Sequence, residues 1–320
     1  MEDKKQTLTE RITQLPFIKN ILDWSKRTPL PGFEGISIYT ITAFIILEAE
    51  KDNLTTRANS VSFSFMLAIF PSIIFIFTLL PHLPISTDYV SMLNNSFLKL
   101  LPNNAHEYLY NIILDITSIK RQGLLSFGFV LAVYFSSSGM MTLMSGFDKS
   151  YNLSFKQRNY WQKSGIAIGL TMILTILFVV SIIFIVMGNK IFNFIDASNS
   201  LPSYIKLLFT AARWLIPLIL VYTGISIIYR FGPSLRKRLH MINPGSILAT
   251  ISSMISSIAF SYFVNNFGKY NELYGSIGAL LVIMVWIQIN AFILLVGFEL
   301  NAAIAVNRDL LAAETSASEV

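Results

Sequence analysis

The sequence predicts an all-α, polytopic membrane protein with six transmembrane helices and additional amphipathic interfacial helices. Six stretches are long and apolar enough to cross about 30 Å of hydrocarbon, which takes roughly 20 apolar residues. The composition agrees, with 53% hydrophobic and only 13% charged residues, against about 25% charged in soluble domains. We therefore expect one membrane domain over 36–306, between a cytoplasmic segment over 1–35 and a cytoplasmic tail over 307–320.

Most of the six predicted spans reach full length on their own, and the fourth needs the preceding Leu207–Arg213 to do so. Pro71 and Pro217 fall inside predicted spans and remove backbone donors, so we expect kinks there. Asn243 is expected to cap the fifth span, with Pro244 at its first helical position. The predicted spans are Ser60–Leu80, Leu124–Phe147, Gly165–Met187, Trp214–Tyr229, Gly245–Val264 and Ile277–Val306.

The basic residues are distributed unevenly between the two sides of the predicted membrane domain. One side comprises the stretch before the first span, the loop between the second and third spans, the loop between the fourth and fifth spans, and the stretch after the sixth. It carries seventeen Lys and Arg residues, and the other side carries seven. Because basic loops stay in the cytoplasm, we expect both termini there. The Arg236–Arg238 run is interpreted as an anchor on anionic lipid rather than an RNA site.

Some segments are predicted to lie on the membrane rather than cross it. Ile36–Leu47 is too short to span and runs into acidic residues, so we expect an interfacial helix over 36–52. The outer loop over 81–123 contains Leu109 and Ile116 at the ends of an apolar i, i+3, i+4, i+7 pattern. Phe192–Lys206 is a similar candidate. Such helices either cover the mouth of a cavity or rest on lipid head groups.

Polar residues within the spans must face protein or a wet cavity. In the fifth span Ser246, Thr250, Ser253, Ser257 and Ser261 form one stripe, which Ser252 and Ser256 widen. Close helix packing and the lining of a cavity both explain such a stripe. The second span has a shorter version with the members Ser138, Thr142 and Ser145, and we expect the two faces to share a seam.

The sixth span is unusually long, and Gln288 and Glu299 lie eleven residues apart on one face. Glu299 is about 33 Å from the outer start of the span, near the inner interface. Arg57 lies at a matching depth, so we predict that Arg57 and Glu299 pair, with Arg230 as the rival partner. The pair is either a structural tie or part of a proton- or ligand-coupled site.

The segment NFGKYNELYGSIGA at 266–279 and GFELNA at 297–302 resemble the YihY/virulence factor BrkB family of bacterial inner-membrane proteins, once labelled ribonuclease BN. The resemblance extends over about residues 36–306. It implies a six-helix inner-membrane protein with proposed roles in envelope resistance and in movement of lipids or amphiphiles. The chain departs from the family at Asn59–Phe63 and has no arginine in the second span. The other matching motifs are Arg57-Ala58, Phe70-Pro71, Tyr229–Pro233 and Pro244-Gly245.

The loop before the sixth span also has an interpretation from its residues alone. Gly268 and Gly275 allow tight turns, and the polar and tyrosine residues after Asn265 suit a membrane interface. We expect a structural hairpin at 266–276, or the mouth of a ligand site on the outer face. The side chains concerned are Asn265, Tyr270, Asn271 and Tyr274, and Asn301 is a further polar candidate in the sixth span.

Three function classes follow from these observations. The favoured one is a transporter or flippase-like protein for a lipid or amphiphile, with membrane lipids as partners and no cofactor. The alternative is a non-transporting structural or assembly partner in the envelope. A metal-dependent ribonuclease needs clustered His and Asp ligands, whereas His82, His106 and His240 are far apart and cysteine is absent. We therefore expect neither an enzyme nor a metal or nucleic-acid site.

Overall fold

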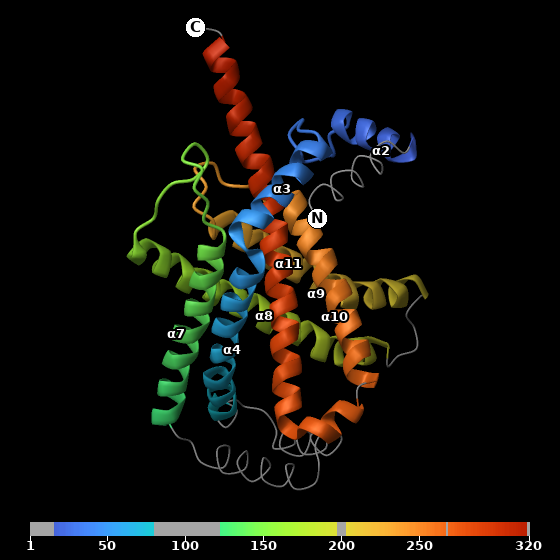
Figure 1. The fold of residues 1–320 in the computed structure, drawn as a ribbon. Helices are drawn as coiled ribbons and strands as arrows, with labels where there is room; N and C mark the ends of the chain where they lie inside the picture. The colour runs from blue at the N-terminus through green and yellow to red at the C-terminus, as the bar shows by residue number, and fades with distance from the viewer. Residues whose placement is uncertain (1–15, 80–121, 197–202, 267, 319–320) are drawn as a thin grey trace.

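The computed structural model describes residues 16–79, 122–196, 203–266 and 268–318, and these residues are almost entirely helical (Figure 1). Within these ranges β-structure is limited to two isolated bridges, Pro29–Ser37 and Phe155–Leu235. The all-α prediction is confirmed. The helices are α2 (Pro16–Arg27), α3 (Ile38–Asp52), α4 (Leu54–Leu79), α7 (Gln122–Gly146), α8 (Tyr160–Asp196), α9 (Ser203–Phe231), α10 (Pro244–Asn266) and α11 (Gly268–Ser318).

Each of the six predicted spans corresponds to one helix, α4 and α7 to α11, although α7 ends one residue before the predicted end of its span and Leu80 lies outside the described residues. Among the described residues, five helices contain a stretch long and apolar enough to cross a membrane, and α9 contributes the shorter apolar stretch Leu215–Phe231. As predicted, α9 extends N-terminally past Leu207. Large apolar side chains such as Phe63, Phe127 and Ile258 are exposed on these helices, which lipid rather than water would cover. The chain is a multi-pass membrane protein.

The six long helices pack as a closed ring of sequence neighbours. Each contacts the next along the chain, and α11 returns to pack against α4. In Figure 1, α8 and α9 cross behind the other four at a steep angle. In this ring α7 lies between α4 and α8, while α10 lies between α9 and α11. The predicted seam between the second and fifth spans is therefore wrong, because the ring separates the two helices.

The predicted helix over 36–52 is present as α3, and it leads directly into α4. Ser37 caps its start, accepting a hydrogen bond from the Thr40 amide at 3.2 Å. Asn53 ends it with a left-handed φ of 45°, a conformation that asparagine tolerates better than most residues. α3 packs against α2 and α11, so one face of this short helix is covered by protein.

The core is concentrated near the ends of α7 and α9 that precede the two basic loops. Phe147, Tyr229 and Phe298 are fully buried there. The Phe147 ring lies 4.4 Å from the Phe298 ring and 5.8 Å from the Tyr229 ring, centroid to centroid. Offset and edge-to-face aromatic pairs of this kind add to the burial of apolar surface. This end of the ring is thus filled with well-packed side chains.

The loops 147–159 and 232–243 are joined beside this core. The Lys156 amide donates to the Ser234 carbonyl, and the Arg236 amide donates to the Ser154 carbonyl, both at 2.9 Å. The Arg158 guanidinium donates to the carbonyls of Gly232 and Pro233 at 2.7 Å, just beyond the end of α9. Burial lowers the pKa of Arg158, and the negative charge of nearby Asp148 partly offsets this decrease. A cation is well placed at the C-terminal end of a helix.

One prediction about α11 needs correction. A hairpin was expected at 266–276, but the helix already begins at Gly268 and contains Gly275. The predicted tail over 307–320 continues this helix as far as Ser318, so that α11 has 51 residues, or about 76 Å of helix. Residues 310–318 are exposed, and this end projects beyond the other helices in Figure 1.

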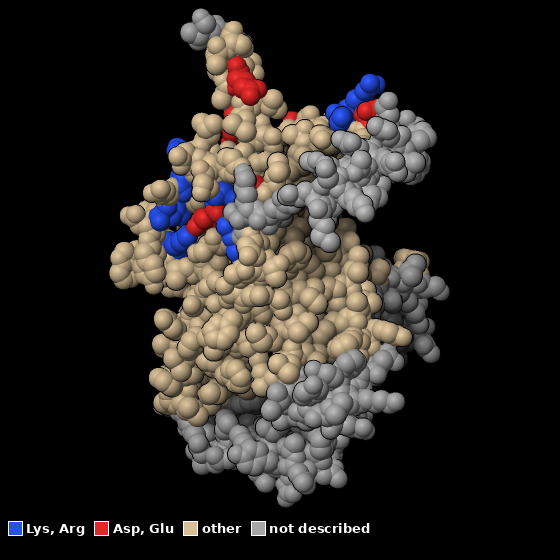
Figure 2. Space-filling view, in the orientation of Figure 1, with Lys and Arg blue, Asp and Glu red and all other residues tan. Residues whose placement is uncertain are grey.

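The two loops and the end of α11 share one end of the molecule with α2 (Figure 1). Figure 2 shows Lys and Arg gathered at the same end, with the tan surface of the other residues covering most of the remaining described part. The C-terminal turns of α8 run on to Asp196, so Phe192–Asp196 continues a span instead of forming a separate interfacial helix. The expected outer-loop helix around Leu109–Ile116 lies outside the described residues.

Candidate functional site

A buried charge cluster lies at the basic end of the ring. Lys149 Nζ is 2.6 Å from Glu299 Oε1 and 3.4 Å from Glu48 Oε2, and the Tyr151 hydroxyl donates to Glu48 Oε1 at 2.8 Å. The side chains of Lys149 and Glu299 are only 2% and 1% exposed. One ammonium group therefore joins two carboxylates, from α3 and from α11.

The chain brings these groups together from three separate segments. Lys149 follows the end of α7, Glu48 lies in the last turns of α3, and Glu299 lies deep in α11. Desolvating an ion pair offsets much of its attraction, so such a cluster adds little net stability while both charges are present. Removing one partner strands a buried charge, which is strongly unfavourable. The cluster thus fixes how α3, α7 and α11 meet.

Arg57 lies near this cluster at the start of α4. Its guanidinium donates from Nη1 to the carbonyl of Gly146, the last residue of α7, at 3.0 Å. The rival Arg230 donates instead to the Leu239 carbonyl at 2.8 Å. The Arg57–Glu299 pair stays a prediction; reversing both charges should restore expression that each single reversal loses.

A second polar network holds the start of α10 against α11. Asn301 donates to Asn243 Oδ1 at 2.7 Å, and its own Oδ1 accepts from the Gly245 amide at 3.0 Å. Asn243 Oδ1 also accepts from the Ser246 amide at 2.8 Å, which confirms its role as the helix cap. Asn301, a predicted polar candidate, is therefore committed to joining two helices.

The backbones of α10 and α11 meet closely at this point. A side chain at Gly245 would overlap the Gly297 carbonyl oxygen and the Asn301 amide, and one at Gly297 would overlap the Tyr229 hydroxyl. That hydroxyl donates to the Leu294 carbonyl at 2.7 Å. Small residues allow such close approach of helices in membranes. The crossing therefore brings the two helix backbones into direct contact.

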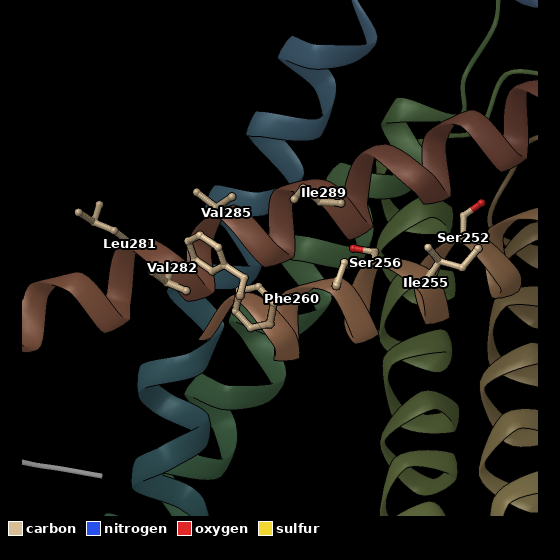
Figure 3. A pocket seen from close by; sticks show the side chains of 10 residues that line it. Ser252, Ile255, Ser256, Phe260, Leu281, Val282, Val285 and Ile289 are labelled. Atoms are coloured by element: carbon tan, nitrogen blue, oxygen red, sulfur yellow. The ribbon is translucent and has the colours of Figure 1, made fainter. Parts of the chain in front are cut away.

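Farther from the basic end, α10 and α11 enclose a groove of about 670 Å³ (Figure 3). At this level Phe260 of α10 contacts Trp286 of α11, with ring centroids 5.7 Å apart. At the basic end, by contrast, the residues that meet between these two helices are glycines. Figure 3 shows Ser252 and Ser256 on the α10 wall and Val285 and Ile289 on the α11 wall. We call this the α10–α11 groove. It is lined by Ser252, Ile255, Ser256, Ala259, Phe260, Phe263, Leu281, Val282, Val285 and Ile289.

The serine stripe of the fifth span divides into two parts. Ser246 and Thr250 are buried at the close crossing, so packing explains that half. Ser253 and Ser257 are half-buried and are absent from the lining of the α10–α11 groove. The groove takes its hydroxyls from the neighbouring Ser252 and Ser256, one residue earlier in each turn.

The hydroxyls of the second span face α4 and α8 instead of the fifth span. Thr142 Oγ1 lies 3.2 Å from Ser64 Oγ and donates to the Ser138 carbonyl at 3.0 Å. In the sixth span, Gln288 Nε2 donates to Asn59 Oδ1 on α4 at 2.6 Å. Thr142 and Gln288 therefore join helices. The side chains of Asn265, Tyr270, Asn271 and Tyr274 lie outside the described part of the chain.

Sequence reasoning missed the centre of the charge cluster. Lys149 was counted only as a basic loop residue, and Glu48 only as the end of an apolar run. The signal that could have found Lys149 is its position two residues after the second span, at the depth expected for Glu299. Across the described residues, no group of three or more His, Cys, Asp or Glu side chains is arranged to hold a metal ion.

Comparison with known proteins places these features in a family. The sequence profile described as virulence factor BrkB matches residues 45–319. YfkH of Bacillus subtilis, whose name describes it as ribonuclease-like, is 28% identical, covering 80% of this chain and 91% of its own length. The UPF0761 membrane protein MS0032 of Mannheimia succiniciproducens is 23% identical over 80% of this chain and 86% of its own. A UPF0761 membrane protein of Psychromonas ingrahamii is 24% identical over 83% and 88%. No solved structure matches.

Proposed function

Because the chain belongs to the virulence factor BrkB family of membrane proteins, we propose that it moves a lipid or another amphiphile across the bilayer without hydrolysing ATP. The observation that carries the proposal is the α10–α11 groove. Its walls are mainly aliphatic and aromatic, and its volume of about 670 Å³ is within the usual range of ligand sites, roughly 300–1,000 Å³.

The chemistry of the groove suits a molecule with an apolar chain and a polar head. Ile255, Phe263 and Val285 offer an apolar surface for a hydrocarbon chain. Ser252 and Ser256 add hydroxyls on the same wall, and polar groups inside a membrane mark pathways for polar substrates. An amphiphile can therefore keep its chain on lipid-like surface while its head group meets hydrogen-bonding partners.

The proposal includes a location, the bacterial inner membrane with both termini in the cytoplasm. Its support is the shared position of α2, the end of α11 and the basic loops at one end (Figures 1 and 2), since basic loops stay in the cytoplasm. Alkaline phosphatase fused at either end should be inactive, and green fluorescent protein fused at either end should fluoresce. Termini reported on opposite faces would contradict this topology.

The transport proposal is tested with purified protein in liposomes that contain a fluorescent phospholipid. Dithionite bleaches only the outer-leaflet label, so translocation appears as bleaching beyond half. We expect such bleaching with the wild type and its loss in Ser256→Trp, because the indole fills the groove. Movement no faster than in protein-free vesicles, for every envelope lipid tried, would overturn the proposal.

Ile258→Trp is the matched control for this experiment. Ile258 lies two residues away on the same helix, is exposed, and does not line the groove. The control should transport lipid like the wild type. If both tryptophan variants lose activity equally, the groove is not the path.

One set of contacts favours the alternative, a non-transporting structural or assembly partner. The bonds from Thr142 to Ser64, from Gln288 to Asn59 and from Asn301 to Asn243 all join helices. Such a protein would retain its envelope phenotype in the Ser256→Trp variant. The name of YfkH raises a third function class, a ribonuclease. Degradation of RNA by the purified protein would support that class. We propose instead that this protein is not an enzyme.

A further inference from the structure

A second groove opens between α7 and α8, on the other side of the ring. Its volume is about 320 Å³. Aromatic and aliphatic side chains from α7 form one wall, and Tyr160, Ser164 and Ile168 form one face of α8 at i, i+4 and i+8. We call this the α7–α8 groove. It is lined by Phe129, Val130, Val133, Tyr134, Ser137, Ser138, Met141, Tyr160, Ser164 and Ile168.

Ser137 is the unusual member of this lining. The residue is only 7% exposed, and its hydroxyl has no hydrogen-bond partner among the described residues. Other hydroxyls on α7 are satisfied by the carbonyl one turn earlier, as Thr142 is by Ser138 and Ser145 by Met141. A buried hydroxyl without a partner is unfavourable. A ligand oxygen in the groove would supply what Ser137 lacks.

The end of the groove near Tyr160 faces the basic loops. α8 begins at Tyr160, directly after the loop that pairs with 232–243 through Phe155 and Leu235. The exposed cations of these loops are Lys156, Arg236, Lys237 and Arg238. Figure 2 shows Lys and Arg clustered at this end of the molecule. A negatively charged group at this end of the groove therefore lies in a favourable potential.

Aromatic residues indicate where this end lies in the membrane. Tyr160 and Trp161 are 64% and 82% exposed, and their rings contact at 5.6 Å. Exposed tyrosine and tryptophan at the end of a span are typical of the head-group level. From Tyr160 to Ile168 the groove wall then runs about 12 Å along α8. The order along the groove is thus charge, hydroxyl and hydrocarbon, which is also the order of groups in a phospholipid.

We propose that the α7–α8 groove binds a phospholipid with an anionic head group. The phosphate lies near the basic loops, an ester or glycerol oxygen accepts the Ser137 hydrogen bond, and an acyl chain lies along Val130, Val133 and Ile168. This site is separate from the α10–α11 groove. It stands whether or not the protein moves lipid.

The test uses the full-length protein with Trp161 as its single tryptophan, after Trp24, Trp214 and Trp286 are changed to phenylalanine. It is placed in nanodiscs of phosphatidylcholine that contain increasing fractions of brominated phosphatidylglycerol, which quenches nearby indoles. We expect quenching at fractions well below those needed with brominated phosphatidylcholine. Identical curves for the two lipids would overturn the proposal.

Variants separate the two parts of the site. Ser137→Ala should raise the fraction of brominated lipid needed for half-maximal quenching about fivefold, by removing one hydrogen bond to an oxygen that both lipids carry. Lys156→Gln with Arg236→Gln should instead weaken the preference for phosphatidylglycerol over phosphatidylcholine, by about fivefold for each charge removed near the surface. Ser145→Ala is the matched control, because its hydroxyl already bonds to Met141 on the same helix. An unchanged quenching curve for brominated phosphatidylglycerol in Ser137→Ala would contradict the assignment of that residue.

Two further measurements complete the test. In detergent without phospholipid, Ser137→Ala should unfold no earlier than the wild type, because it removes an unpaired buried hydroxyl. Addition of phosphatidylglycerol should then raise the unfolding temperature of the wild type more than that of the variant. Excess glycerol 3-phosphate should not reduce quenching; if it does, the groove takes a soluble phosphate ester and the lipid proposal is wrong.

Discussion

The two ends of the helix ring differ in how their helices meet. At the basic end, Lys149 joins Glu48 to Glu299, and Gly245 lies against the carbonyl of Gly297. Farther away, Phe260 and Trp286 contact between the same two helices, which enclose a groove of about 670 Å³. One end of the molecule is filled by protein contacts, and the other half contains an apolar groove.

The difference teaches how one set of helices can be both fixed and open. Polar bonds and glycine contacts set the separation of α10 and α11 at the basic end. Away from that crossing, the neighbouring surfaces are apolar and resemble the lipid around them, so little driving force closes the groove. A change at the basic end should therefore affect the whole fold, whereas a change in the groove should affect only what the groove holds.

The largest expected effect is that of Lys149→Met at the basic end. The variant leaves Glu48 and Glu299 buried without their shared ammonium group. Breaking a buried ion pair on one side costs about 3–5 kcal/mol, so we expect a loss of that size in the free energy of unfolding. Unfolding by titration with sodium dodecyl sulfate in mixed micelles measures it.

Lys156→Met is the matched control, because Lys156 is an exposed lysine of the same loop. It should change the free energy of unfolding by less than about 0.5 kcal/mol, as surface substitutions do. If both lysine variants unfold alike, the cluster does not hold the basic end together, and the contrast between the two ends fails.

The next effect concerns the close crossing of α10 and α11. Gly245→Ala places a methyl group against the Gly297 carbonyl and the Asn301 amide, so backbone must move. Overpacking of this kind costs about 1–3 kcal/mol. We expect that loss in the same unfolding titration, together with a change in lipid binding, because separating the crossing alters the groove beyond it.

Gly165→Ala provides the control for this substitution. Gly165 is also a helical glycine, and an added methyl group there meets no other atom within 4 Å. Alanine is the better helix former by about 1 kcal/mol, so this variant should be as stable as the wild type or more stable. A Gly245→Ala protein that behaves like Gly165→Ala would show that the crossing tolerates separation.

The helices could be predicted from the sequence because each span is a local property. Twenty apolar residues in a row need a helix wherever they lie in a bilayer, and each of the six predicted spans corresponds to a single helix. The cap at Asn243 is equally local, since it depends on Pro244 and on an amide three residues away. The start of α11 was mispredicted because glycine permits a turn without requiring one, as Gly268 and Gly275 show.

The contacts between helices could not be predicted in the same way. Ser252 and Ser253 are neighbours in the sequence, and only the position of α11 decides which one lines a groove. Lys149 required knowledge that α3 and α11 both reach the end of α7. Hydroxyl stripes on two spans gave no information about the order of helices in the ring, so the expected partner of the second span was wrong.

The smallest expected effect concerns the contact between Thr142 and Ser64, which joins the second span to α4 where we had expected it to contact the fifth span. Thr142→Val removes the contact between Thr142 Oγ1 and Ser64 Oγ on α4. In a double-mutant cycle with Ser64→Ala, the coupling energy should be about 0.6 kcal/mol, the average for side-chain hydrogen bonds between membrane helices. Thr175→Val is the control, because that hydroxyl bonds only to the Thr171 carbonyl on its own helix among the bonds of the described chain. Zero coupling between Thr142 and Ser64 would mean that this hydroxyl contact does not help to hold α4 against α7.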